Sequence, residues 1–283
     1  MPTAIIERKT VLITGCSAGS IGHALAKCFH AQDYHVFATV RSANRASDLA
    51  SIPDVEILEL DVTVPESVTR CKDIVSNSTG GKLDILINMA GIETQSPLLD
   101  VDLTEAKDLF DVNVWGPIRM VQAFSPLLIE AKGIVVNQSS IDAALSMVWA
   151  GVFSSSKAAL ARLSETLRIE LDPLGVRVVT IICGSVNTPM FTKPGSRLEL
   201  PKSSYYLGVE DAAYKERMEH RKQASQVDRL AEGLVHDILG GARSPVWRGA
   251  LAPTVRFMTW ALPAWVLDNH INGQRGIKLV KRP

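Results

Sequence analysis

The sequence contains little cysteine, and its cysteines lack the spacings that mark disulfide scaffolds or metal sites. Its 283 residues include four cysteines, Cys16, Cys28, Cys71 and Cys183, without a CxxC pair. Disulfide-rich secreted domains and zinc sites depend on paired or clustered cysteines. We therefore expect free thiols in a reducing compartment and no bound metal.

A surplus of positive charge and long apolar runs are also missing. Lysine and arginine together number 30, as do aspartate and glutamate, so the chain lacks the basic excess typical of nucleic-acid binders. No apolar run approaches the ~20 residues that span a bilayer. Residues 1–10 lack the apolar core of a signal peptide. These features favour an intracellular, cytoplasmic protein that does not bind nucleic acid.

Apolar, strand-like segments alternate with helical segments from residue 10 to about residue 190. This alternation predicts an α/β fold of the Rossmann type, with a doubly wound parallel sheet in a three-layer arrangement. A chain of 283 residues is long enough for one such domain. The predicted strands are 11–13, 35–40, 55–60, 83–87, 134–140 and 176–182, and the clearest helices are 24–29, 103–131 and 154–171.

A glycine-rich turn directly follows the first predicted strand. Gly15, Gly19 and Gly22 lie between this strand and the helical pattern of residues 24–29. Such a turn lets backbone amides approach a pyrophosphate at a helix N-terminus. Glycine clusters occur in many tight turns, so the inference depends on the position after the first strand. We predict a dinucleotide site there.

The ends of the following strands carry residues that suit the rest of a dinucleotide. Strand 35–40 ends in Arg41, which favours the 2′-phosphate of NADP, although a solvated surface arginine fits the same pattern. Asp61 and Val62 suit a contact with adenine, and Asp61 equally suits the N-cap of the next helix. Residues 88–91 are small enough for a ribose or a nicotinamide to approach the backbone.

A serine, a phenylalanine and a lysine mark the predicted reaction centre. Ser140 ends the fifth strand, and Phe153 and Lys157 share one face of the following helix. A serine, a phenol and a lysine suit carbonyl–alcohol chemistry, because a nearby ammonium lowers the pKa of the phenol from ~10. Phe153 has no hydroxyl, so the usual acid of such a site is missing.

The regular alternation ends near residue 191. We predict a dinucleotide-binding core at 8–190, a substrate lid with helices at 191–245, and an apolar and basic C-terminal extension at 246–283. The lid is expected at 193–195 and 201–204, with a surface loop as the alternative. The aromatic and basic residues of 247–267 suit peripheral contact with an intracellular membrane or lipid droplet. A pocket wall or a dimer surface explains the same apolar residues.

These motifs together resemble the short-chain dehydrogenase/reductase family over most of the chain, and especially its branch of 1-acyl-dihydroxyacetone-phosphate reductase-like enzymes. Their combined order and spacing is specific, although each motif alone is common. The segments that carry the resemblance are 14–22, 61–62, 88–91, Asn113, Ser139-Ser140, 153–157 and 184–188.

The resemblance implies a role for each matching residue. Ser140 would polarise the substrate carbonyl, Lys157 would hold the nicotinamide ribose, and Asn113 would support Lys157 through a water. Phe153 occupies the position of the family's catalytic tyrosine. The residues implied to bind NADP(H) are Gly15, Ser17, Ile21, Arg41, Asp61, Val62, Asn88, Ala90, Lys157, Val186 and Thr188.

The sequence departs from the family pattern at Phe153, and also at Met89, Ser20 and Cys183, which replace an asparagine, a glycine and a proline. The last three changes are compatible with cofactor binding. Losing a general acid typically costs ~10²–10⁴ in rate. The change at Phe153, whether natural or engineered, therefore bears directly on the redox reaction.

Three functions fit these residues. The first is an NADPH-dependent carbonyl reductase that takes its proton from Tyr205, Tyr206 or water. The second is an isomerase, lyase or cyclase on the same fold without hydride transfer, and the third is a non-catalytic NADP- or lipid-binding protein. We favour the first, because Ser140, Lys157 and Asn113 are all present. We expect a hydrophobic small-molecule substrate and a homo-oligomer.

Overall fold

A seven-stranded parallel sheet lies at the centre of the computed structural model, which describes residues 5–192 and 197–280. The strands lie in the order β3-β2-β1-β4-β5-β6-β7. Their bounds are β1 Thr10–Ile13, β2 His35–Val40, β3 Val55–Glu59, β4 Ile85–Asn88, β5 Ile134–Ser140, β6 Arg177–Cys183 and β7 Val246–Arg248.

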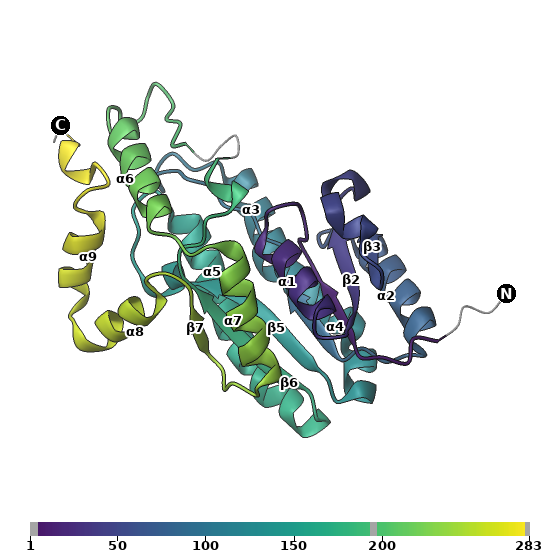
Figure 1. The fold of residues 1–283 in the computed structure, drawn as a ribbon. Coiled ribbons are helices and arrows are strands. Elements are labelled where there is room, and N and C mark those ends of the chain that lie inside the picture. The colour runs from purple at the N-terminus through teal and green to yellow at the C-terminus, as the bar shows by residue number, and fades with distance from the viewer. Residues whose placement is uncertain (1–4, 193–196, 281–283) are drawn as a thin grey trace.

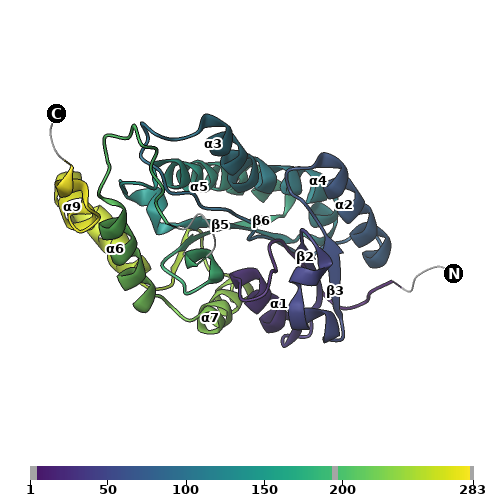
Figure 2. The same ribbon diagram turned by 90° about the horizontal axis from the view of Figure 1, so that it is seen from above.

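Helices cover both faces of this sheet, as Figures 1 and 2 show. One face carries α2 (Pro65–Thr79), α3 (Leu103–Phe110), α4 (Gly116–Ala131) and α5 (Gly151–Leu171), and the other carries α1 (Ile21–His30) and α7 (Val227–Leu239). Beyond the β7 edge lie α6 (Glu210–Lys222), α8 (Ala252–Ala261) and α9 (Ala264–Asn272). The predicted doubly wound, three-layer architecture is confirmed.

Alternating side chains of each strand pack against the two helical layers. In β1, Val11 and Ile13 join the cluster beneath α1 and α7, whereas Leu12 joins the cluster beneath α2 and α4. All three side chains are fully buried. Strands of a parallel sheet covered on both faces are apolar throughout, which explains the short continuous runs in the sequence.

The predicted strands lie within about two residues of the observed ones, a common margin at element ends. Strand 35–40 matches β2, whereas β3 ends at Glu59 and β6 runs from Arg177 to Cys183. The predicted helix 154–171 begins earlier, at Gly151, which places Phe153 inside its first turn. The core predicted from apolar runs is therefore the observed one.

Two elements differ from the sequence-based prediction. The helix predicted at 103–131 is divided by a π-helical segment, Asp111–Trp115, between α3 and α4. A seventh strand, β7, pairs with β6 through Ile181 opposite Val246, so the sheet receives a strand from well beyond residue 190. Three residues between two loops are too few to give a strand signal in the sequence.

The C-terminal apolar segment forms a helical hairpin. Pro253 lies in the first turn of α8 and Pro263 is the N-cap of α9, so each proline begins a helix instead of interrupting one. Within the described residues, every helix is too short or too polar to cross a bilayer. The predicted lid residues 193–195 lie outside the described residues.

Candidate active site

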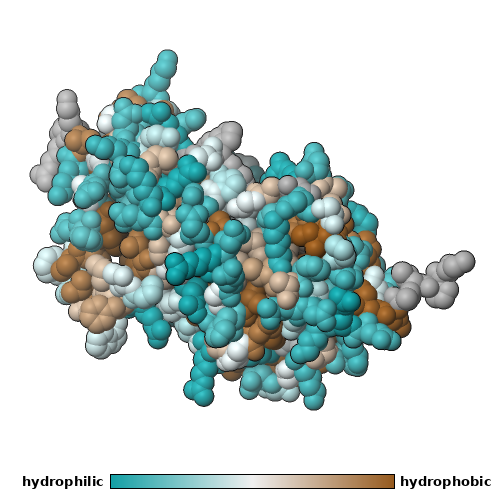
Figure 3. Space-filling model, viewed as in Figure 1, coloured by the Kyte–Doolittle hydropathy of each residue, from teal (hydrophilic) through white to brown (hydrophobic). Residues whose placement is uncertain are grey.

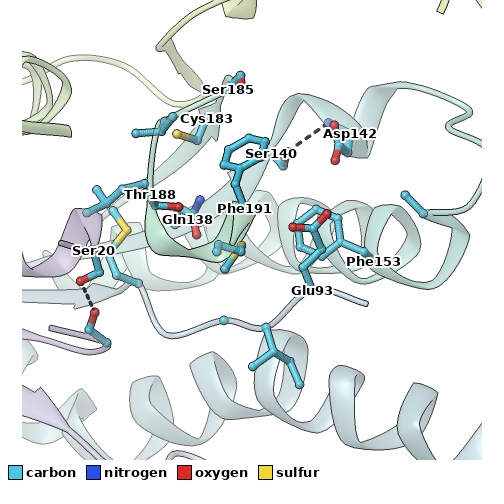
Figure 4. A pocket seen from close by; sticks show the side chains of 18 of the residues that line it. Ser20, Glu93, Gln138, Ser140, Asp142, Phe153, Cys183, Ser185, Thr188 and Phe191 are labelled. Atoms are coloured by element: carbon cyan, nitrogen blue, oxygen red, sulfur yellow. Dashed lines mark hydrogen bonds between the residues drawn. The ribbon is translucent and has the colours of Figure 1, made fainter. Parts of the chain in front are cut away.

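A cavity of about 1250 Å³ runs along the carboxyl ends of the strands. Residues from the ends of β1, β2, β4, β5 and β6 line one side of it, and α6, α8 and α9 supply residues on the other. Figure 4 shows Ser20 and Thr188 toward one end and Ser140, Asp142 and Phe153 toward the other. Ligands of open parallel sheets bind at this edge.

The glycine-rich turn connects β1 to α1 at one end of the cavity. Gly15 has a φ of +76°, and a Cβ on it would lie 2.9 Å from the Cα of Ala90. Ser20 is the N-cap of α1, because its hydroxyl accepts from the backbone N–H of His23. The first turn of α1 contains no acidic residue. Gly15, Ser17 and Ile21 all line the cavity, so this helix N-terminus offers donors to an anionic group.

Two arginines lie where the cavity passes the end of β2. Arg41 and Arg45 are exposed and line it, and Arg45 was missed by the sequence analysis. The turn that holds Arg45 follows β2, so a second basic residue four positions after Arg41 was the available signal. The two guanidinium groups make this rim suitable for a phosphate.

Asp61 and Val62 line the same end of the cavity. Burial raises the pKa of Asp61, but hydrogen bonds from Thr63 and the charge of Arg41 outweigh it and hold the pKa below its ordinary value. The Thr63 backbone N–H and hydroxyl donate to Asp61 Oδ1 over 2.9 Å and 2.7 Å. The alternative expectation of an N-cap is wrong, because α2 begins at Pro65 with Val64 as its N-cap.

The loop after β4 is tied to the end of β1. The Thr14 hydroxyl accepts from the backbone N–H groups of Met89 and Ala90, both over 2.9 Å, and Ala90 lines the cavity. Asn88 is placed differently from the prediction. Its buried amide donates to Asn137 Oδ1 over 2.8 Å, and its side chain does not line the cavity. Asn88 therefore joins two strands beneath the site.

Ser140 and Phe153 line the cavity together. The Ser140 hydroxyl oxygen accepts from the backbone N–H of Asp142 over 3.2 Å, an interaction drawn in Figure 4. The hydroxyl proton remains available for a ligand oxygen. Phe153 is 7% exposed, and its ring centroid lies 5.8 Å from Lys157 Nζ. The predicted serine and ring thus meet in one site.

Lys157 lies beneath the cavity wall and does not line it. Its ammonium donates to the Gln138 backbone oxygen over 3.0 Å and to Gln138 Oε1 over 3.3 Å. Burial lowers the pKa of Lys157 to about 8. Gln138, which does line the cavity, was not singled out in the sequence. Lys157 therefore places a positive charge behind Gln138.

Asn113 occupies the π-helical segment between α3 and α4. It is fully buried, and its amide donates to the Ile92 backbone oxygen over 2.9 Å and to the Ser156 hydroxyl over 3.1 Å. The Ile92 backbone N–H returns a bond to Asn113 Oδ1. π-Helical turns inside helices occur frequently at functional sites. This one positions Asn113 against the loop that forms the cavity wall, without lining the cavity itself.

The turn after β6 completes the cofactor-side wall. Val186 and Thr188 line the cavity. Backbone bonds hold this turn from both sides, because the Ser185 N–H donates to Ala250 and the Asn187 N–H donates to Ser225. The wall therefore depends on segments before α7 and after β7.

The cavity wall also carries charged residues that no sequence pattern marked, among them Glu93, Asp142 and Arg217. None of the four tyrosines of the chain, all within the described residues, lines the cavity. Tyr205 is 75% exposed, and Tyr206 packs edge-on against Trp149. The predicted lid residues 201–204 also lie off the cavity, which is bordered instead by α6. The proton donor at the reacting end is therefore not a tyrosine of this chain.

A family model for short chain dehydrogenases matches residues 9–198. The chain therefore belongs to the short-chain dehydrogenase family, whose members are oxidoreductases, and the predicted family is confirmed. Its 272-residue match to the short-chain dehydrogenase cctT of Talaromyces islandicus is 48% identical and covers 95% of this chain and 96% of that protein.

Two further relatives carry cofactor descriptions. The NADPH-dependent 1-acyldihydroxyacetone phosphate reductase of Schizosaccharomyces pombe is 38% identical over 251 residues, covering 88% of this chain and 83% of the reductase. A solved short-chain dehydrogenase from Burkholderia cenocepacia, in complex with NADP, superposes with a TM-score of 0.73. It is 27% identical, and the match covers 95% of this chain and 99% of that chain.

Proposed function

We propose that the protein is an NADPH-dependent reductase of a carbonyl group on a hydrophobic substrate. NADP(H) fits the end of the cavity next to α1. Arg41 and Arg45 suit its 2′-phosphate, and the N-terminus of α1 suits its pyrophosphate. The relatives that carry NADP or NADPH in their descriptions support this choice. Bound NADPH supplies the hydride for the reduction.

The substrate end of the cavity has apolar walls. Leu145 and Met147 follow the 3₁₀ turn η4 (Ile141–Ala144), and α8 and α9 add further aliphatic side chains. Apolar walls favour binding of a hydrophobic molecule, and a small number of polar groups is enough to orient it. The apolar lining residues at this end are Leu145, Met147, Leu251, Val255, Met258, Leu267 and Ile271.

Ser140 carries the proposal. Its hydroxyl lies on the cavity wall with its acceptor side occupied by the Asp142 N–H, so its proton can donate to a substrate carbonyl oxygen. That bond polarises the carbonyl for hydride attack and strengthens as negative charge develops on the oxygen. Lys157 adds positive charge behind Gln138.

The test restores the missing hydroxyl. Phe153→Tyr should raise NADPH oxidation at least ~10²-fold with 1-phenyl-1,2-propanedione, an apolar probe that carries two carbonyl groups. Ser140→Ala should lower the activity of both the unsubstituted and the Phe153→Tyr proteins. The matched Ser139→Ala should lower the activity less, because the Ser139 hydroxyl donates to the Lys157 backbone oxygen and does not line the cavity. If the unsubstituted protein and the Phe153→Tyr variant both bind NADPH but neither oxidises it, the proposal is contradicted.

A further inference from the structure

If the proposed reduction takes place, its proton comes from water or from a side chain other than a tyrosine. The acidic groups that line the cavity beside Ser140 and Phe153 are Glu93, Asp142 and Cys183, while Glu216 and His220 on α6 and His270 on α9 line the cavity as well. Figure 4 shows Glu93, Asp142 and Cys183 around the same part of the cavity. Their surroundings decide which one can hold and release a proton near neutral pH.

Glu93 and Cys183 are unsuited to this role. Glu93 forms a bidentate pair with Arg217, over 2.6 Å and 3.0 Å, so the guanidinium occupies both carboxylate oxygens. Burial raises the pKa of the Cys183 thiol to about 12, which makes it a weak acid. The Glu93 oxygens are therefore already bound, and the Cys183 thiol holds its proton too tightly.

Asp142 differs from both. Within the described residues it forms no ion pair, and its side chain lines the cavity two positions after Ser140. Burial raises the pKa of Asp142 to about 6, and the charge of Glu93 adds to the rise, whereas Arg275, Arg217 and His220 oppose it. A carboxyl group in such surroundings carries a proton at mildly acidic pH and can release it.

The turn that carries Asp142 also brings it toward Phe153. Asp142 lies in η4 (Ile141–Ala144), which packs against α5, the helix that carries Phe153. The Asp142 backbone N–H holds Ser140, so one residue both positions the serine and presents a carboxyl group to the same space. The phenyl ring of Phe153 fills the tyrosine position beside them.

We propose that Asp142 donates the proton that the family's tyrosine would supply. The inference rests on the proposed reductase function. As the substrate carbon gains a hydride, the π electron pair moves to the oxygen, and that oxygen takes the proton from the Asp142 carboxyl group. NADPH becomes NADP⁺, and the Asp142 carboxylate regains a proton from water.

This assignment predicts a distinctive pH profile. The groups facing Asp142 are Glu93 on the loop after β4, Arg217 and His220 on α6, Arg275 after α9, and Lys157 on α5. Because the acid must be protonated, kcat/KM for reduction should fall about tenfold per pH unit above about 6. Phe153→Tyr should retain its activity at higher pH, since a phenol then supplies the proton.

The decisive experiment is a two-by-two comparison of Asp142→Asn in the native and Phe153→Tyr proteins. NADPH oxidation is followed with the diketone probe. In the native protein Asp142→Asn should lower kcat by at least ~10²-fold and abolish the fall above pH 6. In the Phe153→Tyr protein the same change should cost less than about tenfold, because the tyrosine bypasses the carboxyl group.

The outcomes separate the two proposals. Equal losses in both backgrounds would show that Asp142 only positions Ser140, and would overturn its role as the acid. Unchanged native activity in Asp142→Asn would overturn it as well. If Phe153→Tyr binds NADPH but reduces no carbonyl, the reductase function itself fails. Thermal unfolding of each variant controls for a general loss of structure.

A separate observation concerns the hairpin of α8 and α9. Its inner residues, including Val255 and Leu267, line the cavity, whereas its outer aromatic residues face solvent. Phe257 is 63% exposed, Trp260 82% and Trp265 68%. Figure 3 shows apolar side chains gathered over this part of the molecule. Two exposed aromatic rings on α8 and one on α9, close in sequence to the turn between these helices, form a surface that water solvates poorly.

We propose that the outer face of α8 and α9 binds the interface of a lipid bilayer. Tryptophan rings are apolar but carry one polar N–H group, so tryptophans beside the proline-bearing turn suit the headgroup region of a bilayer. Residues 241–267 contain no acidic residue, and Arg256 is exposed among the aromatic residues, which complements anionic lipid. The same hairpin borders the cavity, so an apolar substrate could enter from the bilayer.

Vesicle sedimentation tests this surface. The full chain should bind phosphatidylcholine vesicles that contain phosphatidylserine, and more weakly vesicles without it. Trp260→Ser with Trp265→Ser should reduce binding at least about tenfold. The control pair, Tyr205→Ser with Leu207→Ser, removes exposed apolar residues elsewhere and should leave binding unchanged. Absence of vesicle binding would overturn the proposal. So would a light-scattering measurement showing that the hairpin variant dissociates a dimer, because the aromatic face would then be a dimer interface.

Discussion

The guanidinium of Arg217 in α6 pairs with both carboxylate oxygens of Glu93, over 2.6 Å and 3.0 Å. The ring of Phe191 lies 4.9 Å from the same guanidinium. Both charged side chains are largely buried. The pair therefore connects α6 to the loop after β4 across the cavity.

Breaking this pair should destabilise the fold. Arg217→Met leaves a buried carboxylate without its partner, which costs about 3–5 kcal/mol. The double variant Arg217→Met with Glu93→Gln should recover part of that loss, because no unpaired charge remains. Urea unfolding measures each value. Lys222→Met, which breaks the exposed pair with Glu219, should leave the unfolding free energy almost unchanged. A loss at Arg217 no larger than this control would contradict the structural role.

Arg41 should determine the choice between the two nicotinamide dinucleotides. Arg41→Asp replaces a favourable charge at the 2′-phosphate by a repulsive one, so NADPH affinity should fall at least about tenfold relative to NADH. Fluorescence titration of bound NADPH and NADH measures the ratio. Arg70→Asp makes the same charge change on the exposed surface of α2 and should leave the ratio unchanged. If Arg41→Asp leaves the ratio of NADPH to NADH affinity unchanged, the 2′-phosphate does not bind at Arg41.

Gly15 should tolerate no side chain. Gly15→Ala combines a positive φ with a Cβ 2.9 Å from the Cα of Ala90, so the loops after β1 and β4 must separate. We expect lost NADPH binding and a stability loss of about 2–4 kcal/mol. Gly81→Ala has a similar φ of +85° with open space around it, and should cost only about 1 kcal/mol. If both variants lose a similar amount of stability, the positive φ alone explains the cost and the close contact with Ala90 contributes nothing.

Lys157 should make the stability of the free protein depend on alkaline pH. Its pKa is about 8 in the folded protein, below the ordinary 10.5 of the unfolded chain. Below pH 8, Lys157 is charged in both the folded and the unfolded protein, and burying its charge destabilises the folded state. Between pH 8 and 10.5 the folded protein loses its proton first, so native stability should rise by up to about 3 kcal/mol relative to Lys157→Met. A stability difference that does not change with pH would contradict the lowered pKa of Lys157.

The sheet and the cofactor side of the cavity were predictable from the sequence, because their signals are local. Apolar runs mark buried strands, and Gly15, Gly19 and Gly22 follow the first of them directly. Ser140 and Phe153 could be paired in the same way, since a strand end and the next helix stay neighbours. The amide of Asn88 was harder to place, because a polar residue at a strand end fits either a ligand or a strand-to-strand bond.

The cluster of charged groups at the reacting end could not be predicted. Glu93, Asp142 and Arg217 are far apart in the chain, and charged residues in loops and on helices usually face solvent. Only the position of α6 beside the sheet edge buries them together. β7 was missed for a similar reason, because its partner β6 lies more than sixty residues earlier.

The most direct test is a calorimetric titration of the native protein with NADPH and with NADH. The account predicts one NADPH site per chain, with a Kd on the order of micromolar and weaker binding of NADH. It also predicts loss of both in Gly15→Ala. Absence of binding heat for both dinucleotides at several temperatures, with a folded protein, would contradict the central claim that this cavity holds the cofactor.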